Sequence, residues 1–208
     1  MALGGSPEYR VILLGEYGVG KTTFLNQVQR ITRNASILES SHSDYVECAI
    51  CVGPPNKQVA VKVLLSDTAG VERYQRTLTN NYFRQADGAI LMYDVADLVS
   101  FESLQDWIEL TQKTLDVGMP EKFVWCLVGN QKDRGSKVDH VRAQSRCEDL
   151  RTTLNFLTCA LKGEGVMEAL TAITEAMHAK NSKWGAQCTS SVALTGTEKH
   201  SNPNCQRC

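Results

Sequence analysis

The sequence predicts an α/β protein with a mostly parallel sheet of six strands, one antiparallel edge strand and helices on both faces. Strand-length apolar runs alternate with helical patterns along most of the 208 residues. Two of the runs, Gly88–Asp94 and Phe123–Gly129, are continuously apolar, as expected for central strands of a parallel sheet covered on both faces. Hydrophobic residues make up 42% and charged residues 22%, which is typical of a globular domain.

The first half of the chain predicts a strand, a helix and a hairpin. Tyr9–Leu14 is a short apolar run that ends at Gly15, so we expect a strand that stops at a turn. A helix is expected to follow from Lys21 to about Arg30. Residues Asp44–Val52 and Val59–Ser66 are rich in β-formers, and the Pro/Gly/Asn cluster between them suits the hairpin at the antiparallel edge.

The second half predicts further strands and helices in alternation. Between the two buried strands, apolar residues from Phe101 to Leu115 recur at helical spacing, and Ser100 is the expected cap. A helix is expected from Val138 to about Leu154, then a short strand at Phe156–Cys159. The last amphipathic helix is marked by apolar residues between Val166 and Met177.

These patterns divide the chain into an N-terminal extension (1–8), one domain (9–179) and a flexible tail (180–208) that has no sustained periodicity. The start shows no apolar leader, and no run approaches the ~18 apolar residues of a membrane span. We therefore expect a cytosolic protein. Its net charge of −1 gives no general attraction to nucleic acid, so we expect no nucleic-acid partner.

The cysteine pattern leaves a metal site as an alternative. The eight cysteines are expected to be reduced, since disulfides are rare in cytosolic proteins. Cys48 and Cys51 form one CxxC pair and Cys205 and Cys208 another, so a four-thiolate zinc site is conceivable. Because neighbouring residues of a strand alternate faces, Cys48 and Cys51 are expected to point in opposite directions, which argues against that site.

Residues 15–22, GEYGVGKT, match the phosphate-binding pattern GxxxxGK(S/T) directly after a predicted strand and at the start of a predicted helix. Glycines let backbone N–H groups converge on phosphate oxygens, and the helix N-terminus adds partial positive charge. Lys21 is expected to reach the outer phosphates and the Thr22 hydroxyl to bind Mg²⁺. The expected nucleotide contacts in this loop are Gly15, Gly18, Val19, Gly20, Lys21, Thr22 and Thr23.

Two later motifs indicate which nucleotide is bound. The segment DTAG (67–70) follows a predicted strand, where Asp67 could hold Mg²⁺ through water and Gly70 could turn its N–H toward a γ-phosphate. The segment NQKD (130–133) ends a central strand at the edge of the sheet where such folds bind ligands. A carboxylate at Asp133 can accept hydrogen bonds from N1–H and N2–H₂ of guanine, a donor pair that adenine lacks. A phosphate-loop kinase or ATPase, the alternative to a GTPase, would select adenine.

In this order the motifs resemble the Ras superfamily, and most closely its Rab branch. The resemblance runs from about Tyr9 to His178 and includes the Rab-like segments DTAGVERY (67–74), YFRQA (82–86) and LMYDV (91–95). It implies a P-loop NTPase fold of the small G domain type, which binds GTP and GDP with Mg²⁺. It also implies recruitment of effector and regulatory proteins in vesicle or membrane traffic.

The resemblance assigns further roles by position. Ser40 falls on the family's switch I threonine and would bind Mg²⁺ together with Thr22 and Asp67. The segment Cys159-Ala160-Leu161 falls on the family's Ser-Ala-Lys loop, which contacts the guanine oxygen. Switch I then spans about 34–45 and switch II about 67–78, and both are expected to respond to the γ-phosphate and to contact partners.

Departures from the family predict altered kinetics. Val71, next to Gly70, stands where the family has the glutamine that orients the attacking water, so no catalytic group is assigned and hydrolysis should be slow. Tyr17 should crowd the γ-phosphate and an incoming arginine; the alternative is that its ring points to solvent and hydrolysis depends on another group. A GTP-bound interaction scaffold that does not cycle is the alternative to a switch. The base pocket should be weak and nucleotide exchange fast, because the family's base-contacting groups are replaced by Arg33, Gln131 and Leu161.

The C-terminus carries a possible lipid attachment site. The chain ends in Cys205-Gln206-Arg207-Cys208, whereas Rab-like proteins usually end in CC or CxC with geranylgeranyl groups. Two prenyl chains, on Cys205 and Cys208, would anchor the protein stably to the cytoplasmic face of a membrane. An unmodified, solvated tail is the alternative.

Overall fold

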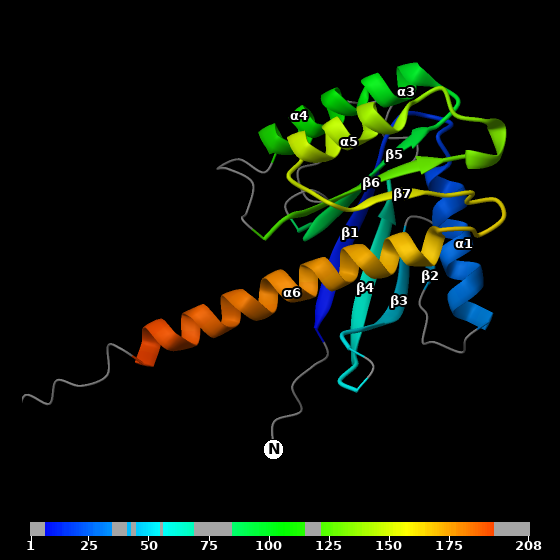
Figure 1. The fold of residues 1–208 in the computed structure, drawn as a ribbon. Coiled ribbons are helices and arrows are strands. Elements are labelled where there is room, and N and C mark those ends of the chain that lie inside the picture. The colour runs from blue at the N-terminus through cyan, green and yellow to red at the C-terminus, as the bar shows by residue number, and fades with distance from the viewer. Residues whose placement is uncertain are drawn as a thin grey trace, which may run out of the picture.

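One sheet forms the centre of the protein in the computed structural model, which describes residues 7–34, 41–42, 45–54, 56–68, 85–114 and 122–193. Within these ranges the strand order is β2-β3-β4-β1-β5-β6-β7 (Figure 1). The strands are β1 (Glu8–Leu14), β2 (Ser41–His42), β3 (Tyr45–Val52), β4 (Val59–Asp67), β5 (Gly88–Asp94), β6 (Val124–Asn130) and β7 (Asn155–Leu157).

The sheet confirms the predicted topology and adds one short strand. β4, β1, β5, β6 and β7 pair in parallel, and β3 pairs antiparallel with β4, as the hairpin predicts. The addition is β2, which pairs antiparallel with the outer edge of β3 through only two residues. Every residue of β5 and β6 is buried, which explains why both segments are continuously apolar.

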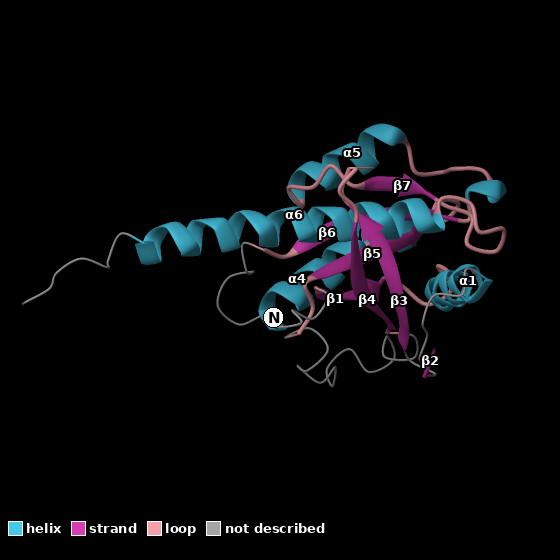
Figure 2. Ribbon diagram, turned by 90° about the horizontal axis from the view of Figure 1, so that it is seen from below, coloured by secondary structure: helices cyan, strands magenta, loops and turns pink. Residues whose placement is uncertain are grey.

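Helices cover both faces of the sheet, as predicted. α1 and α6 pack on one face around a cluster that includes Phe24 and Leu170, and α3, α4 and α5 pack on the other around Trp107 and Cys147 (Figure 1). α6 continues to Ala193, well past the sheet (Figure 2), so residues 180–193, expected to belong to a flexible tail, are helical instead. The helices are α1 (Lys21–Asn34), α3 (Leu98–Glu102), α4 (Leu104–Thr114), α5 (His140–Asp149) and α6 (Val166–Ala193), with a 3₁₀ turn η2 (Lys132–Arg134).

The helix expected after β5 begins earlier than predicted, and Ser100 is not its cap. The cap is Asp97, whose carboxylate accepts a hydrogen bond from the backbone N–H of Val99 at 3.0 Å. Ser100 lies inside α3, where its hydroxyl donates to the carbonyl of Asp97 at 2.7 Å and accepts from the N–H of Asp94 at 3.0 Å. Ser100 therefore fastens the helix start to the end of β5.

α5 is shorter than the expected helix. A capping residue fixes its start, and a residue in the left-handed conformation follows its end. The carboxylate of Asp139 accepts from the N–H of Arg142 at 2.8 Å and caps the first turn. At the other end Arg151 has φ +51°, a left-handed conformation that cannot continue an α-helix. The expected extension to Leu154 is therefore wrong.

The structure bears on the conceivable zinc site and on membrane-spanning segments. Cys48 is buried and Cys51 exposed, so this CxxC pair faces both ways as the strand alternation predicts, whereas Cys205 and Cys208 lie outside the described residues. Among the described helices, none combines the length and the apolar character that crossing a bilayer requires.

Candidate functional site

The three chemical motifs meet at the carboxyl edge of the parallel strands. The phosphate loop follows β1, Asp67 ends β4, and Asn130 ends β6. Strand pairing places Leu13 opposite Asp67 and Asp94 opposite Asn130. Strands later in the chain lie on both sides of β1, and ligands bind at such a reversal of strand order in doubly wound sheets.

The backbone of the phosphate loop needs glycine at two positions. Gly15 has φ +141°, and a Cβ there would lie 2.1 Å from the carbonyl oxygen of Met92 in β5. Gly20 has φ +99°, and its Cβ would lie 2.3 Å from Nδ2 of Asn130. Gly18 also has a positive φ, but a Cβ there would meet nothing within 4 Å. The loop is thus pressed against both β5 and the end of β6.

Lys21 lies inside the curve of this loop. Only 4% of the residue is exposed, and its ammonium donates to the carbonyls of Gly15 at 2.8 Å and Glu16 at 2.9 Å. The positive charge is therefore held at the centre of the loop, where an incoming phosphate would meet it.

Thr22 and Asp67 come together as the sequence predicts. The Thr22 hydroxyl donates to Oδ2 of Asp67 at 2.6 Å. Hydroxyl and carboxylate oxygens are hard donors of the kind that Mg²⁺ prefers, so the pair fits that ion. Thr68, which sequence reasoning missed, is 3% exposed and donates to the carbonyl of Leu13 at 2.6 Å, which ties the end of β4 to β1.

Asn130 joins three loops through its amide. Its Nδ2 donates to the carbonyl of Val19 at 2.8 Å, and its Oδ1 accepts from the Thr158 hydroxyl at 2.9 Å and from the N–H of Ala160 at 3.0 Å. Thr158 was not predicted, although a polar residue at the end of a strand, just before the Cys159-Ala160-Leu161 motif, is a usable signal. Asn130 thus organises the site from a buried position.

Gln131 holds the neighbouring carbonyl of the phosphate loop. Its Nε2 donates to the Gly18 carbonyl at 3.1 Å. In a planar trans peptide the C=O and the following N–H point in opposite directions. Holding the Gly18 and Val19 carbonyls toward 130–131 therefore turns the N–H groups of Val19 and Gly20 the other way, where they are free to converge on an anion.

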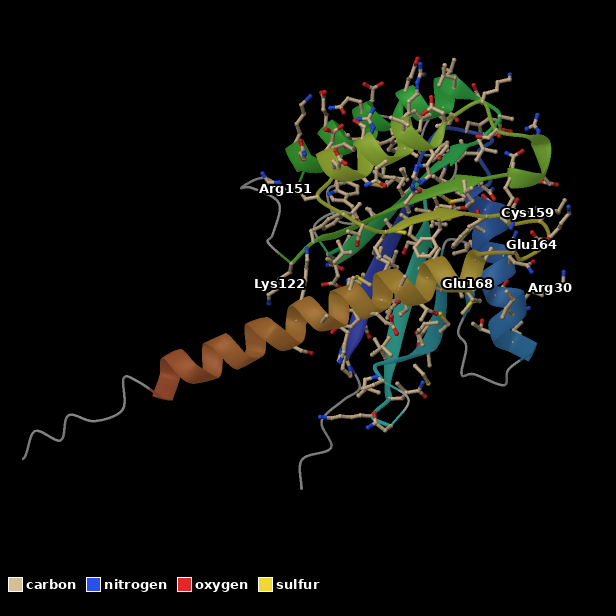
Figure 3. All side chains as sticks on the ribbon, in the orientation of Figure 1. Arg30, Lys122, Arg151, Cys159, Glu164 and Glu168 are labelled. Atoms are coloured by element: carbon tan, nitrogen blue, oxygen red, sulfur yellow. The ribbon has the colours of Figure 1, made fainter. Side chains whose placement is uncertain are left out.

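Asp133 lies in a local cluster of polar contacts. The Cys159 thiol donates to Oδ1 at 3.4 Å, and the Lys162 ammonium lies 3.6 Å from Oδ2. The Cys159 contact, followed by a backbone N–H and the Lys162 charge, holds the pKa of Asp133 below its ordinary value, which favours the ionised carboxylate. Figure 3 labels Cys159 and Glu164 in the loop that leads to α6, and the two pair through their backbones.

The other expected site residues are exposed or lie outside the described residues. Leu161 is 76% exposed and its side chain has no polar group, whereas Lys162, which sequence reasoning missed, provides the cation beside Asp133. Thr23, Arg33 and Tyr17 are exposed. The positions outside the described residues are Ser40, Gly70, Val71, Cys205 and Cys208, together with most of switch I and switch II.

Comparison with known proteins agrees with this geometry. A family model described as the Ras family matches residues 10–179. The Ras-related protein YPTC6 of Chlamydomonas reinhardtii is 36% identical to this chain over 184 residues, which cover 84% of this chain and 78% of that protein. The Ras-related protein rab-11.1 of Caenorhabditis elegans is 36% identical over 79% of this chain and 74% of its own length. The Ras-related protein RABA1g of Arabidopsis thaliana is 36% identical to this chain, and the match covers 84% of this chain and 77% of that protein. The chain therefore belongs to the Ras family of small GTPases and is Rab-like.

Proposed function

We propose that this chain is a guanine-nucleotide-dependent switch that binds GTP and GDP through residues 15–23, Asp67 and 130–133. Rab-type GTPases act in vesicle traffic, so effector and regulatory proteins would contact its switch regions. The observation that carries the proposal is the joining of two loops, in which Asn130 and Gln131 hold the phosphate loop while Asp133, two residues on, stays ionised. One short segment would thereby hold both the phosphate loop and the proposed base selector.

The chain's own residues divide the binding between them. Lys21 and the N–H groups of the phosphate loop would hold the phosphates, and Asp133 with the backbone of 159–161 would hold guanine. Thr22 and Asp67, with Ser40 from switch I, would hold Mg²⁺, which neutralises phosphate charge when bound. Ser40 would connect the state of the phosphates to switch I.

The nucleotide content of the protein as purified tests this proposal. Nucleotide released from the protein by acid and separated by ion-exchange chromatography should be GDP or GTP at close to one nucleotide per chain, with no adenine nucleotide. An empty protein that also takes up no labelled GDP in Mg²⁺ would contradict the proposed function. Equal displacement of bound GDP by ATP and GTP would remove Asp133 from its role as selector.

We further propose that hydrolysis is slow, because the Val71 side chain can neither donate nor accept a hydrogen bond. A Val71→Gln variant should hydrolyse GTP at least about tenfold faster in a single turnover, since it restores a group able to orient water. The control is Val71→Leu, which changes size without adding a polar group. A wild-type rate matching that of ordinary family members would contradict slow hydrolysis, and equal rates in wild type and Val71→Gln would remove Val71 as its cause.

Slow hydrolysis leaves a GTP-bound interaction scaffold as the second candidate function. Val71 favours it because it lacks a polar group. Tyr17 would favour it by crowding the γ-phosphate, but 76% of this residue is exposed, as in the alternative in which its ring points to solvent. The two candidates differ in what the chromatography finds. A scaffold is purified mainly with GTP, and a cycling switch mainly with GDP.

The ends of the chain complete the proposal. Residues 1–8 would be an extension, 9–179 the nucleotide-binding domain, and 180–208 a tail that carries prenyl groups on Cys205 and Cys208. Lipidation is typical of Rab proteins, and two chains suffice for stable attachment to the cytoplasmic face of a membrane.

A further inference from the structure

We propose that Arg134 is a positioning residue for the nucleotide: together with Asp94 it orients the Gln131 amide that holds the phosphate loop. The inference rests on the proposed function and names a group that the family motifs do not include. It arises from three side-chain contacts that follow one another across three loops.

The Gln131 side chain is fixed at both ends. Its backbone is left-handed, with φ 62° and ψ 36°, at the turn between β6 and η2. Its Nε2 donates to the Gly18 carbonyl at 3.1 Å, and its Oε1 accepts from Nη1 of Arg134 at 2.7 Å. A guanidinium only donates and a carbonyl only accepts, so a single orientation of the amide satisfies both neighbours.

Arg134 is itself held by a rigid carboxylate. The same Nη1 lies 2.8 Å from Oδ2 of Asp94, which is 7% exposed at the end of β5. The other oxygen of Asp94 accepts from the N–H of Ala96 at 2.8 Å, and its backbone N–H donates to the hydroxyl of Ser100 at 3.0 Å. Contacts therefore run without a break from Asp94 through Arg134 and Gln131 to the phosphate loop.

The charged guanidinium of Arg134 interacts with the neutral amide of Gln131. A lysine at position 131 would bring its own charge to the Gly18 carbonyl, whereas glutamine is a weaker donor. A cation at the amide oxygen polarises the group and strengthens its N–H as a donor. Removing Arg134 should thus loosen the Gly18 carbonyl and the Val19 N–H behind it, and nucleotide should leave faster.

The surroundings allow substitution and provide a matched control. The Arg134 side chain is 58% exposed, so its replacement opens no buried cavity. It lines a pocket of about 380 Å³ beside the phosphate loop together with Tyr17, Asp97 and Lys137. Lys137 carries the same charge in the same pocket but does not take part in the contacts that reach Gln131. Lys137→Leu therefore controls for loss of local positive charge.

The test is the dissociation rate of fluorescently labelled GDP in Mg²⁺, chased with unlabelled GDP. Arg134→Leu should raise this rate roughly fivefold, the size expected for loss of one supporting hydrogen bond. Lys137→Leu should change it by less than about twofold. In the Gln131→Lys background no amide needs orienting and a guanidinium would repel the new ammonium, so Arg134→Leu should leave the rate unchanged or lower it.

Comparing Arg134→Leu in the wild-type and Gln131→Lys backgrounds distinguishes a positioning role of Arg134 from general disruption of the fold. An equal rise in both, or no rise in wild type, would overturn the role of Arg134 while the proposed function stands. If the wild-type chain takes up no labelled GDP, the proposed function fails and this inference with it. Should Arg134→Leu lose the circular dichroism of the folded protein, Arg134→Gln, which keeps one donor, carries the same comparison and should give a smaller rise.

Discussion

Replacing Asp133 by asparagine should reverse the base preference of this protein. The carboxylate can accept two hydrogen bonds from N1–H and N2–H₂ of guanine, whereas an asparagine amide presents a donor of its own toward one of them. Xanthine carries a carbonyl where guanine carries the 2-amino group, so the same amide can donate to it. We expect guanine affinity to fall roughly a hundredfold or more, because a site built to pair with a hydrogen-bonding group discriminates strongly against a mismatched one, and xanthine affinity to rise.

Competition against labelled GDP measures both changes. Unlabelled GDP and XDP are titrated against wild type, Asp133→Asn and Asp149→Asn, an exposed carboxylate of α5 that controls for the loss of one negative charge. An equal loss of affinity for GDP and XDP in the Asp133 variant would mean that the substitution disrupts the loop and does not change base selection.

The pH dependence supplies an independent check on Asp133. Its pKa is held below the ordinary aspartate value by the Cys159 thiol first, then by a backbone N–H and the charge of Lys162. A lowered pKa keeps the carboxylate ionised as the pH falls through the usual aspartate range. Guanine binding through this group should therefore persist to a lower pH in wild type than in a Cys159→Ala variant.

The sequence predicts the site well where a motif fixes both a residue type and its place on a strand. Asp67 and Asn130 end strands, and Lys21 and Thr22 begin the helix that follows the loop after β1, so their meeting at one edge of the sheet follows from the parallel topology. Hydrophobic period alone could not place Asp97 rather than Ser100 as the helix cap, because either side chain can accept from the backbone.

Contacts between loops are the part that the sequence does not predict. Thr158 reaches Asn130 from the residue after β7, and Arg134 reaches Asp94 across the sheet edge. Neither belongs to a periodic pattern, and each depends on where the tertiary fold brings two distant turns together. Gln131 illustrates the consequence. From sequence it is a weakened substitute for lysine, but the structure surrounds it with partners that orient its amide.

Lys21→Met should abolish most of the stabilisation that GDP gives to this protein. The ammonium would make charge-assisted contacts to the phosphates, and losing them should lower GDP affinity roughly a hundredfold or more. Binding to the folded state stabilises it by an amount that depends on ligand concentration over Kd, and each hundredfold of affinity is worth about 2.7 kcal/mol. Methionine keeps the apolar stem and the approximate volume in the buried position.

Thermal unfolding with and without excess GDP and Mg²⁺ distinguishes this effect from simple damage. In the absence of nucleotide the variant should already unfold somewhat earlier, because the carbonyls of Gly15 and Glu16 lose the donor that satisfies them. The larger difference should come on adding GDP, which raises the Tm of wild type and of the control Lys57→Met far more than that of Lys21→Met. Equal increases in all three proteins would show that Lys21 serves the loop alone and that the phosphates are held elsewhere.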